Sequence, residues 1–401
     1  MSSNRPAIII PAEHQKIIDE VMADVRKNDG LATVDIEKFW ADQEIAIKDP
    51  FGDIPQVPLG LAGMSGECIY DELGIPEDYW KYEQDEEWRL QMHCVYNDKS
   101  EKIVGRRLLN EKAHDKTKDY PATKQLYHVF ESENVWHVGS WWLQQSAHGE
   151  DELTALLDRV EARLENLRSF ILPEGWDEAK ARLMQQGIKP GLVRGIRGPV
   201  TFATSIFGAE YLIYLIYDNP DLASRFSSLI LKGLLKMAEI MDEEAGYTPE
   251  TAPRGFGFAD DNCALLTADM YELFGYPVLK GMFDKYSPAP EDWRYQHSDS
   301  AMAQLLPVIG RLDMKGVNFG PTVTVDEIRH YMPNAAIHGQ LAPFTFSMNE
   351  EERMIAEFLR DYDLAKEKKG LVFTTAGSIN NGSLLTGMRI LMSVIQKYGR
   401  F

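Results

Sequence analysis

The sequence predicts an α/β protein built on a (β/α)8 barrel, with a helical and hairpin extension. From residue 255 onward, short apolar runs alternate five times with amphipathic helical segments. Such units with short connections are typical of a parallel sheet covered by helices. No GxGxxG segment opens any of these units, and 401 residues suit a closed barrel better than a doubly wound sheet.

The first 50 residues are expected to form a helical extension, and residues 51–401 a single barrel domain. The apolar residues of the extension recur at the spacing of one buried helical stripe, at Ile17, Ile18, Val21 and Val25. Residues 57–61 then form a short apolar segment among prolines and glycines. This segment predicts a buried strand.

A β-hairpin is expected within residues 120–145, inserted into the barrel domain. Two β-rich runs flank the polar stretch 131–134. Trp136 and Trp141 lie in the second run, and we expect them to form an aromatic wall for a flat substrate. Tryptophans that only fill the core are the alternative interpretation.

Six segments are identified as strands of the expected eight-stranded barrel, and several helices after them carry recognisable starts. The segments are LVRGIRGPVT, GFGFADD, WRYQHSDS, VNFGP, AAIHGQ and LVFTTAGS. Asn219-Pro220 opens a long helix, because proline fits a first turn whose N–H groups have no helical partner. Further helix starts are expected at Thr267, at the capping-box pair Thr324 and Glu327, and at Ser347 and Glu350 with the same spacing.

Composition excludes several classes of partner. The chain has 62 acidic residues against 42 Lys and Arg, a net charge of −20 that repels nucleic acid and anionic lipid. A small molecule or another protein is therefore the expected partner. Three cysteines without a CxxC spacing exclude a disulfide framework and a zinc ribbon. With no signal peptide and no apolar run of about 18 residues, we expect a cytoplasmic protein that does not enter a membrane.

Polar side chains follow the expected strands at the end where a barrel carries its functional groups. A carboxylate pair, a His-x-Asp and a second histidine converge there, as metal ligands and general acids do. The residues expected to be catalytic are Asp260, Asp261, His297 and Asp299. Substrate binding is expected of Asn318, His338 and Gln340, together with the two tryptophans of the hairpin.

The sequence leaves a structural interpretation open for five of these residues. Asp299 could cap the next helix. Asp260 and Asp261 could cap the helix near Thr267, the commoner role of aspartates at such turns. His297 and His338 could be buried histidines bonded to backbone carbonyls.

The segments FGFADDNCALLTADMYELFGYPVLKGMFD, HSDS and LLPVIGRLDMKGVNFGPT resemble the uroporphyrinogen decarboxylase superfamily. The upstream RGPVTFATSIFGAEYLIYLIYDNPDL and the final TAGSINNGSLLTGMRILMSVIQKYGRF resemble it too. The resemblance covers residues 150–401 well and 50–150 loosely. It implies a TIM barrel with one deep polar cleft.

Within that superfamily, the motifs favour the branch of corrinoid-dependent methyltransferases, which includes O-demethylases. True uroporphyrinogen decarboxylases carry an Arg-rich motif near the first strand, where this chain reads QVPLGLAGMSGE. Many methyltransferases of the branch hold zinc through His-x-Cys and a later Cys. Those positions read His297-Ser298-Asp299 and Gly377-Ser378 here, so the resemblance does not extend to thiolate ligands or to thiol substrates.

The resemblance implies transfer of a methyl group from a small donor, such as a methoxylated aromatic, to a separate corrinoid protein. The leaving oxygen must be neutralised, by a zinc ion held at His297 and Asp299 or by a general acid. Cys263 is a further candidate metal ligand, with a small buried apolar residue as the alternative. No Asp-x-His-x-x-Gly stretch is present, so the corrinoid is expected on a partner. A decarboxylase of a small or tetrapyrrole carboxylic acid and a non-catalytic binding protein of the same fold are the other candidates.

Overall fold

The computed structural model describes residues 8–62 and 64–401 and divides the chain into two compact units. The first unit contains the chain up to Ala113, residues 299–303 and residues 316–401. The second unit contains residues 114–298 and 304–315. Each unit has three parallel strands and a set of helices of its own.

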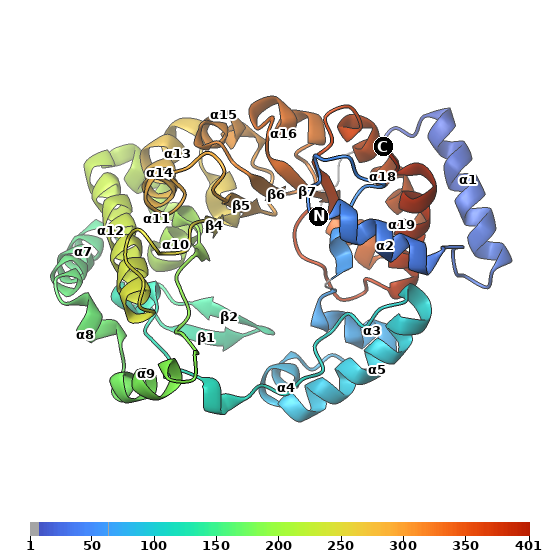
Figure 1. Cartoon of the computed structure of the whole chain (residues 1–401). Helices are drawn as coiled ribbons and strands as arrows, with labels where there is room; N and C mark the ends of the chain where they lie inside the picture. The colour runs from blue at the N-terminus through green and yellow to red at the C-terminus, as the bar shows by residue number, and fades with distance from the viewer. Residues whose placement is uncertain (1–7, 63) are drawn as a thin grey trace. The chain divides into compact units, whose positions relative to one another are not determined.

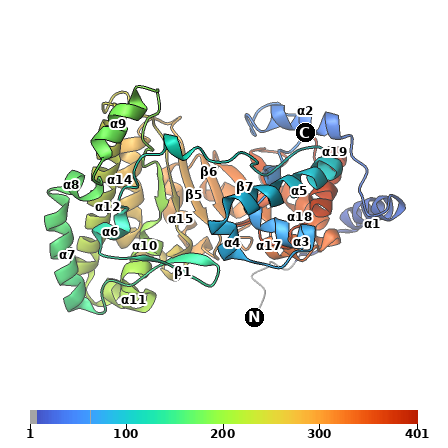
Figure 2. The same ribbon diagram turned by 90° about the horizontal axis from the view of Figure 1, so that it is seen from below.

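The strands of the second unit are β3 (Gly195–Arg197), β4 (Phe256–Ala259) and β5 (Arg294–Ser298). β4 pairs in parallel with both β3 and β5, with Ala259 opposite His297 at the carboxyl end. The helices that follow these strands are α10 (Pro199–Phe207), α11 (Ala209–Asp218), α12 (Pro220–Glu244), α13 (Ala268–Phe274), α14 (Tyr276–Tyr286) and α15 (Leu306–Ile309). The long helix α12 packs against α14 (Figures 1 and 2).

The hairpin of the second unit consists of β1 (Asn134–His137) and β2 (Ser140–Leu143), which are antiparallel. Its turn is Val138-Gly139, both with positive φ, the backbone of a two-residue hairpin turn. A hairpin is thus present in the expected region, but the expected pairing is wrong. Both strands lie in the second run, where Gly139 favours the φ of the turn, and the first run forms helix α6 (Leu126–Val129). Four further helices complete this region: α6 (Leu126–Val129), α7 (Glu150–Leu164), α8 (Leu167–Ile171) and α9 (Trp176–Met184).

The strands of the first unit are β6 (Gly316–Phe319), β7 (Ala336–Leu341) and β8 (Leu371–Thr375), again parallel. Leu59 forms a parallel bridge with Phe373, so the predicted strand at 57–61 lies beside β8 as a single bridge. The helices after these strands are α16 (Val325–Tyr331), α17 (Pro343–Ser347), α18 (Glu351–Ala365) and α19 (Leu385–Tyr398).

Helices also dominate the beginning of the chain. They are α1 (Ala12–Lys27), α2 (Ile36–Ala46), α3 (Ile69–Leu73), α4 (Tyr79–Gln84) and α5 (Glu86–Val104). Most of the predicted stripe of α1 is confirmed, since Ile18, Val21 and Val25 are buried, while Ile17 is only half-buried. α1 packs on α18 (Figure 1), where His14 Nε2 lies 2.8 Å from Asp363 Oδ2.

All six segments predicted as barrel strands contain a strand, and most predicted helix starts are confirmed. Asn219 caps α12 and Thr267 caps α13. Thr324 and Glu327 form the predicted capping box at the start of α16. The start predicted at Ser347 is wrong, because Ser347 ends α17. Asn349 then adopts a positive φ of 53°, which separates α17 from α18.

Among the described residues, no single helix is long and apolar enough to cross a membrane. α10 and α11 reach the necessary length and composition only as a pair, and the pair is bent by 105°.

A buried carboxylate on α18 predicts how stability depends on pH. Burial raises the pKa of Asp361 from 3.8 to about 6, although Arg360 Nε donates to its Oδ1 at 2.8 Å and opposes the shift. Ionising such a group costs folding free energy, and this cost grows between about pH 4 and pH 6. We expect the melting temperature of Asp361→Asn to rise relative to the wild type across this range in calorimetry. A constant difference from pH 4 to pH 7 would contradict the raised pKa.

Candidate active site

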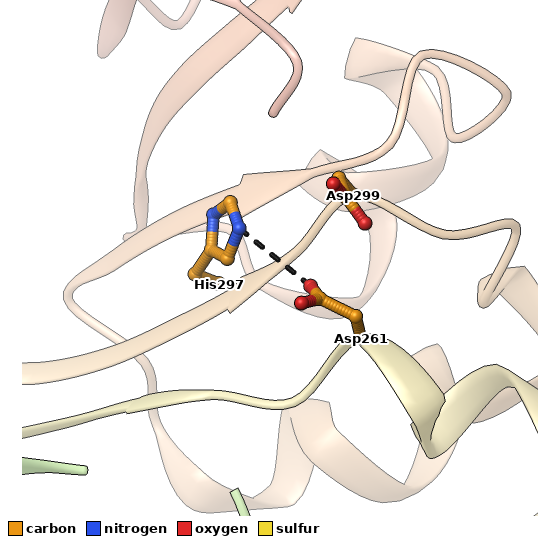
Figure 3. Close-up of side chains that lie close together, drawn as sticks. All are labelled: Asp261, His297 and Asp299. Carbon is orange, nitrogen blue, oxygen red and sulfur yellow. Dashed lines mark ion pairs between the residues drawn. The ribbon is translucent and has the colours of Figure 1, made fainter. Parts of the chain in front are cut away.

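Asp261 and His297, two of the predicted catalytic residues, lie next to each other in the second unit. His297 is on β5, opposite the last residue of β4, and Asp261 begins the short 3-10 helix that follows β4. His297 Nε2 lies 3.6 Å from Asp261 Oδ1 (Figure 3). The two side chains are 25% and 40% exposed, so an ion or a small molecule can reach both.

Asp299 follows His297 by two residues, on the segment that leaves β5. One ligand atom from each of Asp261, His297 and Asp299 lies within 4.8 Å of the other two (Figure 3). One imidazole nitrogen and two carboxylate oxygens suit a zinc centre in which three protein ligands leave one position open. The 3.6 Å between Nε2 and Oδ1 is close to the roughly 3.4 Å between ligands of a tetrahedral zinc. These residues therefore fit a divalent metal ion.

Two glycines of the first unit approach the backbone of Asp299 closely. A Cβ added to Gly320 would lie 2.5 Å from the carbonyl oxygen of Asp299, and one added to Gly377 would lie 2.7 Å from its Cβ. Gly377 also has a φ of +119°. A larger residue at either position would push Asp299 away, so both glycines permit the position that Asp299 occupies.

Asp260 lies beside Asp261 in the chain but is engaged elsewhere. It is completely buried, and its Oδ1 accepts the backbone N–H of Thr201 at 2.7 Å. Burial raises the pKa of Asp260 to about 6, against the effect of the Thr201 N–H. Asp260 therefore caps a helix, but the helix is α10 rather than the one that begins near Thr267. The catalytic role expected of Asp260 stays a prediction.

Cys263 is buried and less suited to hold a metal than the three residues of the cluster. Its Sγ lies 3.7 Å from Ser298 Oγ, and burial raises the pKa of the thiol well above its usual value. Metal binding requires the thiolate, which this environment disfavours. The role of Cys263 as a ligand stays a prediction.

The predicted substrate-binding residues of the first unit lie at the ends of β6 and β7. Asn318 Nδ2 donates to the carbonyl oxygens of His338 and of Thr375, the latter at 2.9 Å, and so connects three strands. Gln340 Nε2 donates to the carbonyl oxygen of Gly320 at 3.2 Å. Burial lowers the pKa of His338, which favours its neutral ring. These contacts hold the strand ends together, and substrate binding by these residues stays a prediction.

A cavity of about 290 Å³ lies beside Asp299 in the first unit. Its lining consists of residues that follow β6, β7 and β8, with the two residues after β5: Asp299, Ser300, Pro321, Ala342, Pro343, Phe344, Ala376, Ser378 and Asn380. A cavity of this size holds a small organic molecule. Asp299 and Ser378 are at positions that the sequence singles out, whereas Phe344, on α17 (Pro343–Ser347) after the end of β7, is not.

The two predicted tryptophans form a cross-strand pair on the hairpin. Trp136 lies opposite Trp141, with ring centroids 5.5 Å apart and planes at 74°. Trp141 is 39% exposed, so part of its ring is accessible. Their role as a substrate wall stays a prediction.

Comparison with known proteins identifies the family of the chain. Residues 182–398, more than half of the chain, match the family model for uroporphyrinogen decarboxylase (URO-D). The chain belongs to the uroporphyrinogen decarboxylase family. This membership confirms the resemblance found in the sequence, and no curated protein matches the chain.

A solved structure also resembles this member of the uroporphyrinogen decarboxylase family. A methyltransferase from Methanosarcina mazei superposes with a TM-score of 0.53 and 15% identity, over 89% of this chain and 98% of that chain. At this identity the likeness shows the fold alone. Together with the family, it confirms the predicted α/β class of the (β/α)8 barrel, to which the parallel strands and helices of both units conform.

The cluster predicts metal binding that depends on its own side chains. We expect the purified chain to bind one Zn²⁺ or Co²⁺ ion, and Asp261→Asn and His297→Gln to weaken the affinity by at least about tenfold, because each removes a ligand. Titration calorimetry measures the affinity. Asp269→Asn, at an exposed carboxylate of α13, is the matched control and should bind like the wild type. Equal affinities in all four proteins would remove Asp261 and His297 from a metal site.

Proposed function

We propose that the chain is an enzyme that transfers a methyl group from a small oxygen-bound donor, such as a methoxylated aromatic, to a corrinoid held by a separate cytoplasmic protein. The convergence of Asp261, His297 and Asp299 at strand ends carries this proposal. The fold shared with a methyltransferase supports it. So does the segment 56–67, which lacks the arginines that the resemblance associates with porphyrinogen carboxylates.

The chemistry explains why such a cluster is needed. The electron pair of Co(I) forms the new bond to the methyl carbon, and the pair of the broken C–O bond stays on the oxygen. An alkoxide or phenoxide leaves poorly unless its charge is neutralised. A divalent metal ion bound at the cluster would supply that neutralisation as a Lewis acid.

Different residues would hold the metal ion and line the substrate cavity. His297 Nε2 and the carboxylates of Asp261 and Asp299 are the groups that would hold the ion. The cavity beside Asp299 offers Phe344 and Pro343 as apolar walls and Ser378 as a polar group, a combination that suits a small aromatic ether.

Incubation with reduced cobalamin and a panel of methoxylated aromatics tests the function. We expect the absorbance change of cobalt methylation with at least one donor. Asp299→Asn should lower this rate by about 10²-fold or more without lowering the melting temperature, because it removes a charged ligand or a proton donor. Asp326→Asn, at an exposed carboxylate of α16, is the control and should react normally.

The other outcomes separate the competing functions. Release of carbon dioxide from a small carboxylic acid, with no cobalt methylation, would make the chain a decarboxylase. Ligand binding with neither reaction would make it a binding protein. Full activity in protein shown by elemental analysis to be metal-free would assign the cluster to proton donation instead of metal binding.

A further inference from the structure

We propose that Thr201 and Asp260 are positioning residues, which fix Asp261 in front of His297 through the first turn of α10. The inference rests on the proposed function only in taking Asp261 and His297 as the reacting pair. The contacts that carry it lie within the second unit and join α10 to the turn at residues 260–262.

α10 lacks a local cap, and Asp260 replaces it. The helix begins after Gly198, which has no side chain, and Pro199 has no N–H to satisfy. The Asp260 carboxylate accepts the N–H of Thr201 at 2.7 Å through Oδ1. A negative group at this end of a helix is favoured by the helix dipole as well. The backbone at Asp260 is therefore attached to α10, a helix 60 residues earlier in the chain.

The residue on the other side of Asp261 is attached to the same helix. The Asn262 backbone N–H donates to Thr201 Oγ1 at 2.9 Å, and Asn262 Nδ2 donates to Thr204 Oγ1 at 2.7 Å. Both neighbours of Asp261 thus bind α10, and Thr201 binds both of them, one through its N–H and one through its hydroxyl. This leaves Asp261 in a turn that is fixed at each end.

The turn is also joined to the strand that carries His297. The Asp260 N–H donates to the carbonyl oxygen of His297 at 2.9 Å, and the Gly198 N–H donates to the carbonyl oxygen of Ala259 at 2.6 Å. A Cβ on Gly198 would overlap the side chain of Asp260, so the start of α10 lies directly against the turn. The position of Asp261 relative to His297 is consequently set by α10 and β5 together.

The Thr201 hydroxyl tests the positioning role, because it interacts with both neighbours of Asp261. The Thr201 N–H donates to Asp260 Oδ1, whereas the hydroxyl accepts the Asn262 N–H at 2.9 Å and also interacts with the Asp260 carboxylate. Thr201→Val keeps the N–H and the branched shape but removes the acceptor. Thr201→Ser keeps the acceptor. A role in positioning therefore predicts that serine rescues what valine loses.

The experiment compares these two variants with Thr267→Val by crystal structure, Co²⁺ affinity and melting temperature. Thr267 Oγ1 accepts the Met270 N–H at 3.3 Å and so caps α13, which makes Thr267→Val the matched control for loss of a threonine hydroxyl. In Thr201→Val we expect the Asp261 carboxylate to move away from His297, beyond 3.6 Å, and the Co²⁺ affinity to fall about tenfold. Thr201→Ser and Thr267→Val should keep both the pair and the affinity.

A Thr201→Val structure that retains the pair at its original separation overturns the proposal, and so does an equal displacement in Thr201→Ser. If Thr201→Val does not fold, Thr204→Val, which removes the acceptor of Asn262 Nδ2, is tested with the same expectation. If the wild type binds no Co²⁺, the crystal structures decide alone. A displaced pair restored by serine, in a protein that methylates no cobalt, would uphold the positioning role and refute the proposed function.

Discussion

The bond between the Asp260 carboxylate and the first turn of α10 is the constraint on which the candidate site depends. It places a fully buried carboxylate against a helix start that has no cap of its own. Such a carboxylate is costly to bury unless backbone N–H groups satisfy it, and an uncapped helix start is costly in the same way. The bond between Asp260 Oδ1 and the Thr201 N–H offsets part of both costs, and it holds the turn that carries Asp261.

The same division of work recurs in the first unit. The Asn318 amide N–H donates to carbonyl oxygens of β7 and β8. The Gln340 amide N–H donates to the carbonyl oxygen of Gly320. Gly320 and Gly377 then allow the chain to approach Asp299 closely. Most polar residues at the strand ends thus hold the backbone, and a few present groups to a ligand. This is expected where strand ends are buried and every polar group must find a partner.

The kind of ligand offered bears on the chemistry that this family member can perform. Imidazole and carboxylate are harder ligands than the thiolates that activate a substrate thiol, and they suit a metal that acts on oxygen. Cys263, two residues after Asp261, is buried, and its Sγ lies 3.7 Å from Ser298 Oγ. The ligand set of Asp261, His297 and Asp299 is therefore consistent with an oxygen-bound methyl group rather than a thioether.

The sequence by itself determined the elements and the end of the strands where polar residues gather. Hydrophobic periodicity and helix caps such as Asn219 and Thr324 depend on residues only a few positions apart, so the sequence alone predicts them. Only the tertiary structure decided which of two adjacent aspartates is buried, because Asp260 is selected by α10, 60 residues away. The single bridge of Leu59 to β8 depends on an equally distant contact. Local sequence rules do not distinguish Asp260 from Asp261. Long-range packing buries Asp260 against α10 and leaves Asp261 facing His297.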